Sequence, residues 1–152
     1  MTVSRTRQHV LVVDDDPACR ALLNAIFDLH GFEVTSTDSV FGLSELIARV
    51  QPSVIVLDVA LPYRSGASWL VQLKANPATS RIPVVILSAV PDVLPRERLE
   101  LAQAVVRKPF RSRTLVQAVQ AACDGARFAE AALPFDRTLR IYSGSSQRLG
   151  SL

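Results

Sequence analysis

Polar side chains that could bind a metal or a phosphoryl group stand at the ends of short apolar segments. Asp14 and Asp15 follow VLVV, Asp58 follows VIVL, Ser88 follows VVIL, and Lys108 comes soon after a Val-Val pair. Clustered carboxylates repel one another unless a cation lies among them, and hard oxygen ligands select Mg²⁺. A hydroxyl and an ammonium opposite the metal would complete a cradle for a phosphoryl group. Asp58 is then the expected nucleophile.

The segment that carries Asp58 has the pattern of a strand buried on both faces. Its four large apolar residues, Val54 to Leu57, lie between Pro52 and Pro62. Such runs are typical of parallel sheets, in which helices cover both faces. The strand would place Asp58 at the carboxyl edge of the sheet, where ligands bind in open α/β folds.

The rest of the chain alternates between expected strands and helices. The expected strands are His9 to Val13, Phe32 to Ser36, Val54 to Asp58, Pro83 to Ser88, and Val105 with Val106. The expected helices run from Pro17 to a stop at Gly31, from Ser39 to Val50, through Trp69, Leu70 and Leu73, from Arg96 to Ala104, and from Ser112 to a stop at Gly125. Five βα units in succession predict an α/β fold, a flavodoxin-like doubly wound parallel sheet of five strands in the order 2-1-3-4-5 with five helices.

Capping residues and apolar spacing set these helix boundaries. Asp16 with Pro17 is an N-cap followed by proline at the first helical position. Ser39 is expected to open the second helix, and Ser112 is expected to cap the last one. For Asp16 this capping role is preferred to a role in the site. The apolar spacing of Ala18, Leu22, Leu23, Ile26 and Phe27 predicts the first helix.

Composition limits the class of protein. A chain of 152 residues, about half of them apolar, is long enough for one domain with its own core. The division expected is a flexible N-terminus (1–8), a domain (9–125) and a partly disordered tail (126–152). The net charge of +3 comes from arginines near the two ends, so no basic face for nucleic acid is predicted. Two distant cysteines, with no apolar run long enough to span a membrane, fit a cytoplasmic protein.

Four motifs in order resemble the receiver domain of two-component response regulators. They are VLVVDDD (10–16), VIVLDVALP with Gly66 (54–66), VVILSA (84–89) and RKPF (107–110). The resemblance implies that Asp58 accepts a phosphoryl group from a histidine kinase or a histidine phosphotransfer protein. It further implies a Mg²⁺ site, contacts to the phosphoryl oxygens and a cis Lys108–Pro109 bond. The residues implied are Asp15, Asp58 and the backbone carbonyl of Ala60 for Mg²⁺, Asp14 through water, and Ser88 with Lys108 for the phosphoryl oxygens.

Three positions depart from the family or bear on its kinetics. Receivers commonly carry Tyr or Phe three residues before the lysine, as a side chain that swings inward on activation. Val105 stands there and argues against such a switch, so movements of the loops remain as a route. Ala60 and Val90 stand where side chains influence the hydrolytic water, and neither can form a side-chain hydrogen bond. We therefore expect slow self-dephosphorylation and no other enzymatic activity.

The tail after 125 is too short for an output domain, so the sequence predicts a stand-alone, monomeric regulator that acts by docking on a partner protein or by passing the phosphoryl group on. Two alternatives remain open at this point. A phosphatase of the haloacid dehalogenase type is suggested by the Asp14-x-Asp16 pair, although it leaves Asp58 without a role. A receiver-like binding module that works without phosphorylation is suggested by Val105.

Overall fold

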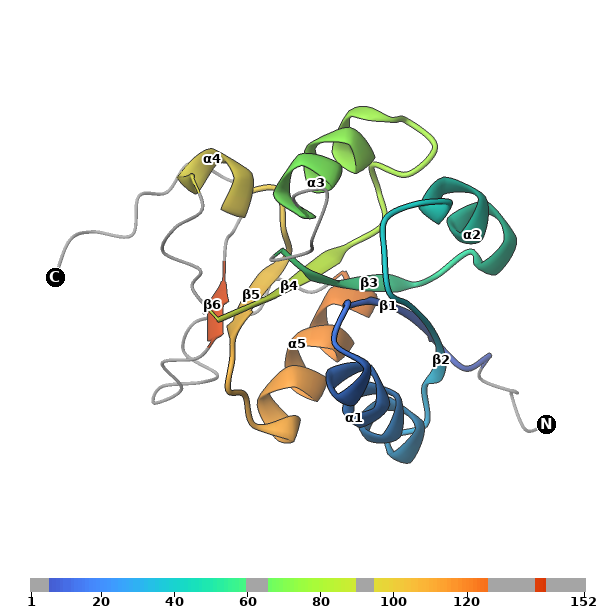
Figure 1. Cartoon of the computed structure of the whole chain (residues 1–152), viewed down its shortest axis with the longest axis vertical. Coiled ribbons are helices and arrows are strands. Elements are labelled where there is room, and N and C mark those ends of the chain that lie inside the picture. Colours follow the sequence, from blue (N-terminus) through green and yellow to red (C-terminus); the bar gives the residue numbers. More distant parts are fainter. Residues whose placement is uncertain (1–5, 60–65, 90–94, 126–138, 142–152) are drawn as a thin grey trace, which may run out of the picture.

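The computed structural model describes residues 6–59, 66–89, 95–125 and 139–141. Within these residues, six strands form one sheet in the order β2-β1-β3-β4-β5-β6 (Figure 1). Their bounds are β1 (His9–Val13), β2 (Glu33–Thr37), β3 (Val54–Asp58), β4 (Val84–Ser88), β5 (Ala104–Arg107) and β6 (Leu139–Ile141). The first five strands are parallel, which confirms the predicted order 2-1-3-4-5. The short β6 runs antiparallel to β5 and was not predicted.

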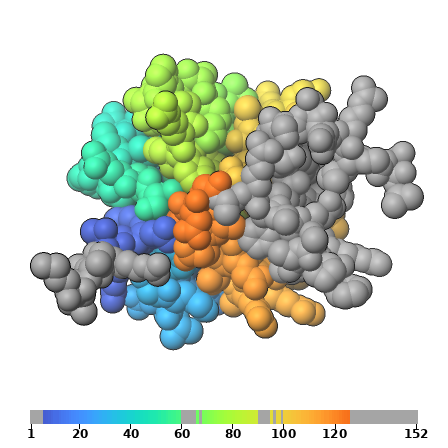
Figure 2. Space-filling model, turned by 180° about the vertical axis from the view of Figure 1, so that it is seen from behind, coloured from blue at the N-terminus to red at the C-terminus, as the bar shows by residue number. Residues whose placement is uncertain are grey.

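Five helices of the described residues cover the two faces of this sheet. Their bounds are α1 (Pro17–Leu29), α2 (Leu43–Val50), α3 (Gly66–Ala75), α4 (Arg96–Leu99) and α5 (Ser112–Cys123). Helices α2, α3 and α4 lie on one side, and α1 and α5 lie on the other (Figure 1). Seen from behind, α2 and α3 occupy the upper part of the surface and α1 and α5 the lower part (Figure 2). The sheet is thus the middle of three layers.

Alternation along the strands explains this layering. Leu11 and Val13 belong to a buried cluster with side chains of α2 and α3, whereas Val10 and Val12 belong to a second cluster with side chains of α1 and α5. Successive side chains of a strand point to opposite faces, so a continuous apolar run supplies both layers. Trp69 lies in the first cluster and is 5% exposed, so it packs in the core.

Helix α1 follows the sequence prediction at its start but buries only some of its apolar residues. The Asp16 carboxylate accepts a hydrogen bond from the Ala18 amide at 3.0 Å, as an N-cap should, and Gly31 after the helix has a φ of +84°. Ala18 and Leu22, two of the apolar residues whose spacing indicated this helix, are exposed, Leu22 by 52%. The buried residues of α1 are Leu23, Ile26 and Phe27, and the partly buried Cys19 packs against the same cluster.

Helix α2 begins four residues later than predicted. Ser39 does not open it, since its hydroxyl caps a local turn by accepting a hydrogen bond from the Phe41 amide at 3.2 Å. Gly42 follows with a φ of +69° and is the actual N-cap residue. A left-handed residue cannot continue a right-handed helix, so the helix starts only at Leu43, and Phe41 remains 68% exposed.

Three other boundaries need correction. Helix α4 ends at Leu99 rather than Ala104, because Ala104 belongs to β5 and pairs with Val85 of β4. Helix α5 is capped by Arg111, which has extended backbone and whose carbonyl accepts the Leu115 amide at 3.1 Å. Ser112 is therefore the first helical residue and not a cap. Strand β2 is shifted by one residue, to Glu33–Thr37.

Candidate functional site

A lysine bound to two carboxylates lies at the carboxyl edge of the sheet. Lys108 comes directly after β5, Asp14 directly after β1, and Asp58 ends β3. The Lys108 Nζ atom lies 3.1 Å from Asp14 Oδ2 and 3.3 Å from Asp58 Oδ2. In the sequence, Lys108 is 94 residues from Asp14 and 50 residues from Asp58. They meet because β1, β3, β4 and β5 are consecutive neighbours in a parallel sheet.

Asp14 is held by donors on several sides. It is 1% exposed, and burial by itself raises the pKa of its carboxyl. Hydrogen bonds from the Cys19 thiol, the Asp16 amide and Lys108 outweigh that effect and hold the pKa below its ordinary value. The Asp16 amide lies 2.9 Å from Asp14 Oδ1. Asp14 therefore stays ionised inside the protein, as the charge of Lys108 requires.

The carboxylates of Asp14 and Asp58 change the pKa of Lys108. Burial by itself lowers the pKa of the lysine, but the hydrogen bond to Asp14 and the charges of Asp58 and Asp14 raise it to about 12. Its backbone amide also donates to the Ser88 carbonyl at 2.9 Å, which fixes the turn after β5. The Lys108–Pro109 bond is cis, as the resemblance implied. Lys108 thus carries its charge at neutral pH and lies beside the candidate nucleophile Asp58.

The backbone after Asp58 is crowded by Gly66, the first residue of α3. A Cβ atom at Gly66 would lie 2.6 Å from the Asp58 carbonyl oxygen and 2.8 Å from the Val59 Cα atom. Both neighbours are backbone atoms that cannot turn away, so only glycine fits without a shift of the chain. The glycine of the second motif therefore permits α3 to begin directly against the site.

Three carboxylates meet the requirements of a cation site. Asp14, Asp15 and Asp58 each offer an oxygen, and these oxygens all lie within 4.8 Å of one another. Asp15 is exposed, so one side of the group opens to solvent. An acidic triad of this kind is typical of a Mg²⁺ site. Mg²⁺ binds one or two carboxylates directly and keeps several waters, through which a further carboxylate can act.

The remaining predicted site residues have different outcomes. Ser88 ends β4, is 1% exposed, and pairs in register with Arg107, next to the strand end that carries Lys108. The structure thus places Ser88 at the same edge of the sheet. Ala60 and Val90 lie outside the described residues. The predicted roles of the Ala60 carbonyl and of the Val90 side chain stay predictions.

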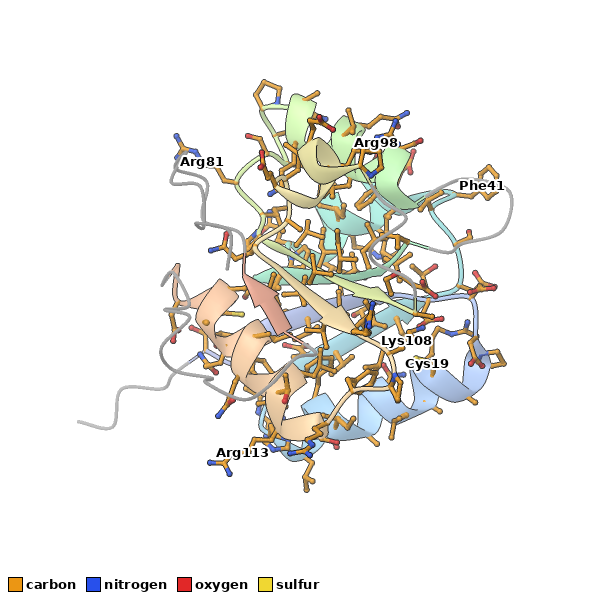
Figure 3. All side chains as sticks on the ribbon, turned by 90° about the vertical axis from the view of Figure 1, so that its left-hand side faces the viewer. Cys19, Phe41, Arg81, Arg98, Lys108 and Arg113 are labelled. Atoms are coloured by element: carbon orange, nitrogen blue, oxygen red, sulfur yellow. The ribbon has the colours of Figure 1, made fainter. Side chains whose placement is uncertain are left out.

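Sequence reasoning missed two residues of α1 that contact Asp14. The Cys19 thiol donates a hydrogen bond to the Asp14 carboxylate; burial and this carboxylate together raise the pKa of Cys19 to about 12, so it stays a thiol. Figure 3 shows Cys19 close to Lys108. The Arg20 guanidinium donates to the Asp14 carbonyl at 2.7 Å. The Asp16-Pro17 cap could have indicated both residues, because a helix that starts at Pro17 has Cys19 and Arg20 in its first turn, close to Asp14.

Comparison with known proteins gives the family of this fold and site. The model of the response regulator receiver domain matches residues 10–120. The chain belongs to the response regulator receiver domain family. This family consists of receivers rather than conventional enzymes, and receiver domains partner with histidine kinases. The assignment leaves the phosphatase alternative without support.

Individual relatives and solved structures agree with this assignment. Protein PetR of Rhodobacter capsulatus is 32% identical over 123 residues, which cover 78% of this chain and 50% of PetR, so the chain spans about half the length of that relative. A response regulator from Chloroflexus aurantiacus has 26% identity and a TM-score of 0.72, with 78% of this chain and 99% of that chain covered. The receiver domain of a sensor histidine kinase from Pseudomonas aeruginosa, solved with magnesium in its active-site cleft, has 24% identity and a TM-score of 0.70, with 78% and 99% covered.

Proposed function

We propose that this receiver accepts a phosphoryl group on Asp58, with Mg²⁺, from the phosphohistidine of a histidine kinase or a histidine phosphotransfer protein. The phosphorylated chain would signal by binding a partner protein or by passing the phosphoryl group on. The observation that supports this most directly is Lys108 Nζ, 3.3 Å from Asp58 Oδ2 and 3.1 Å from Asp14 Oδ2. A cation held this way stands ready for the charge of an incoming phosphoryl group.

The chemistry requires a nucleophile, a cation and donors for the phosphoryl oxygens. An Asp58 carboxylate oxygen would attack phosphorus, forming a P–O bond while the P–N bond of the phosphohistidine breaks. The bonding electrons return to the imidazole, which takes up a proton. Asp58 is nearly buried, so the carboxylate that attacks is already stripped of most water. Lys108 would then exchange its carboxylate contacts for a phosphoryl oxygen.

The acidic triad supplies ligands for the Mg²⁺ that this proposal requires. Asp15 and Asp58 would hold Mg²⁺ together with the Ala60 carbonyl, and Asp14 would act through water. When bound, the ion would neutralise the charge that builds up on the phosphoryl oxygens. Asp14 has the protein's own donors on both oxygens, from Asp16 on Oδ1 and Lys108 on Oδ2, which favours an indirect role in metal binding. Asp15, exposed beside it, is the freer ligand.

Several properties of the function remain proposals. The structure has no helix, among its described residues, long and apolar enough to cross a membrane. The division into residues 1–8, the receiver at 9–125 and a tail at 126–152 is also a proposal, and the family match at residues 10–120 supports its middle part. The cytoplasmic location, the stand-alone and monomeric state and the absence of nucleic-acid binding stay predictions. Slow self-dephosphorylation does too, and a phosphoryl lifetime of seconds would contradict it.

The phosphoacceptor is tested by incubating the chain with phosphoramidate and Mg²⁺ and measuring intact mass. We expect the native chain to gain one phosphoryl group and Asp58→Asn to gain none. Chelation of the metal should abolish the gain in the native chain. Asp16→Asn is the matched control, because Asp16 is a neighbouring carboxylate whose role is to cap α1, and it should be phosphorylated like the native chain.

Other outcomes discriminate the alternatives. A gain that persists in Asp58→Asn and disappears in Asp14→Asn would show that Asp58 is not the nucleophile. No gain in the native chain with phosphoramidate or with a panel of histidine kinases would favour the binding module that works without phosphorylation. That module has one specific feature in its favour, the buried Val105 at the position where receivers commonly carry an aromatic side chain.

A further inference from the structure

The sheet ends in a strand that the receiver match does not include. Strand β6 pairs antiparallel with β5, with Ala104 opposite Ile141, Val105 opposite Arg140 and Val106 opposite Leu139. It lies at the outer edge of the sheet, beyond the family match at residues 10–120 (Figure 1). The chain therefore supplies its own neighbour for what would otherwise be an edge strand.

Strands β2 and β5 differ in polarity, which explains why only β5 needs a further strand beside it. Strand β2, which forms the opposite edge, reads EVTST and is exposed or partly exposed along its length. Strand β5 reads AVVR, and its first three residues are all at most 2% exposed. An apolar edge with unpaired backbone groups is a template for another strand, whereas a polar edge can face water. The β5 edge is thus a surface suited to bind an extended strand.

Strand β5 also connects this edge to the phosphorylation site. Val106, which pairs with Leu139, lies two residues before Lys108. The Lys108 amide donates to the Ser88 carbonyl, and the Lys108 side chain binds Asp58. A movement of Lys108 from the carboxylates to a phosphoryl oxygen would therefore act on the end of β5.

Such a movement acts on two pairings of unequal size. Strands β4 and β5 share four residue pairs, and the hydrogen bond from the Lys108 amide extends them. Strands β5 and β6 share three pairs only. Short pairings at the edge of a sheet open with the smallest free energies, so β6 is the element that would yield first.

We propose that the outer edge of β5 is a strand-docking surface whose occupant is the chain's own segment Leu139–Ile141, and that phosphorylation of Asp58 releases this segment. The release rests on the proposed function, whereas the docking of the segment does not. In this arrangement the β5 edge is closed in the unphosphorylated receiver. It becomes available when Lys108 turns to the phosphoryl group.

Hydrogen exchange of the full chain, followed by mass spectrometry, tests the release. With phosphoramidate and Mg²⁺, we expect amides in a peptide covering Leu139–Ile141 to exchange at least about tenfold faster, while β1 amides are unchanged. Asp58→Asn under the same conditions should show no change. Intact mass of the same samples reports whether the phosphoryl group is present. Phosphorylated chain with unchanged exchange at 139–141 would overturn the release, and absence of phosphorylation would overturn both the proposed function and the release.

Docking itself is tested without phosphorylation, by Arg140→Pro with Arg140→Thr as the matched control. Proline in the middle of β6 removes a backbone N–H and disfavours pairing, whereas threonine suits a strand. We expect faster exchange of the β5 amides in Arg140→Pro and native exchange in Arg140→Thr. Equal protection of β5 in all three chains would show that Leu139–Ile141 does not cover this edge, and would overturn the proposal.

Discussion

The two lysines of this chain are both partly buried and have opposite surroundings. Lys108, after β5, lies between the carboxylates of Asp14 and Asp58. Lys74, in α3, donates from Nζ to the backbone carbonyls of Ser80 at 3.1 Å and Ile82 at 2.6 Å. Carboxylates raise the pKa of Lys108 to about 12, whereas burial lowers the pKa of Lys74.

The difference shows what turns a lysine into part of a reactive site. Carbonyls satisfy the hydrogen bonds of an ammonium but carry no net charge, so Lys74 holds the connection between α3 and β4 and, among the described residues, has no charged partner to exchange. Carboxylates supply both hydrogen bonds and charge, so Lys108 can move between anions as the charge of the site changes. We therefore assign Lys74 a structural role, and the proposed function gives Lys108 a chemical one.

The largest difference between the two lysines should be in phosphorylation rate. Lys108→Met removes the cationic donor over Asp58, and loss of one such donor lowers reaction rates by about 10²–10³-fold in enzymes that stabilise oxyanions. We expect a decrease of that order in the rate of phosphorylation by phosphoramidate, followed by intact mass. Lys74→Met should react at the native rate. Equal slowing of both variants would remove the distinction.

Stability in urea should separate the lysines in a second way. Removing one partner of a buried ion pair costs about 3 kcal/mol, so Lys108→Met should lower the free energy of unfolding by that order in the absence of divalent cations. Mg²⁺ should restore part of it, because the carboxylates regain a cation. Lys74→Met should cost about 1–2 kcal/mol through two lost hydrogen bonds, with no response to Mg²⁺ beyond that of the native chain. A Mg²⁺ response confined to Lys74→Met would contradict the assignment.

The smallest effect, and the one that sharpens the comparison most, concerns alkaline pH. The pKa of Lys108 is raised, so its contribution to stability is fully present below 10.5 and is lost as pH rises towards about 12. The pKa of Lys74 is lowered, so its charged form is penalised in the folded state, and its contribution improves as pH rises through the folded pKa towards 10.5.

Urea unfolding of the native chain and the two methionine variants across this pH range measures both contributions. As pH rises, the difference in unfolding free energy between the native chain and Lys108→Met should shrink above pH 10.5. The same difference for Lys74→Met should grow as pH rises towards 10.5. Slopes of the same sign for both lysines would show that their surroundings do not differ as described.

Much of the fold follows from local sequence because local chemistry sets it. The apolar runs of β1, β3 and β4 are continuous and bounded by polar or turn-forming residues, and Asp16 with Pro17 specifies the start of α1. The site residues Asp14, Asp15, Asp58, Ser88 and Lys108 could be predicted together, since parallel strands place their carboxyl ends at one edge.

Tertiary structure determined what local pattern left undetermined. Ser39 and Ser112 are good caps, yet the left-handed Gly42 and the extended Arg111 set the actual starts of α2 and α5. Leu22 has apolar spacing typical of a helix, but α1 buries Leu23, Ile26 and Phe27 and leaves Leu22 in solvent. The antiparallel β6 depends on contacts with β5 that are remote in sequence, so no local signal marks it.

The sequence by itself thus determined the parallel sheet and the residue types at its carboxyl edge, because strand propensity and motif order are local properties. Only the tertiary structure determined that Lys108 bridges Asp14 and Asp58 and that β6 covers β5. These contacts depend on distances between segments far apart in the chain, and such distances exist only once the layers have packed.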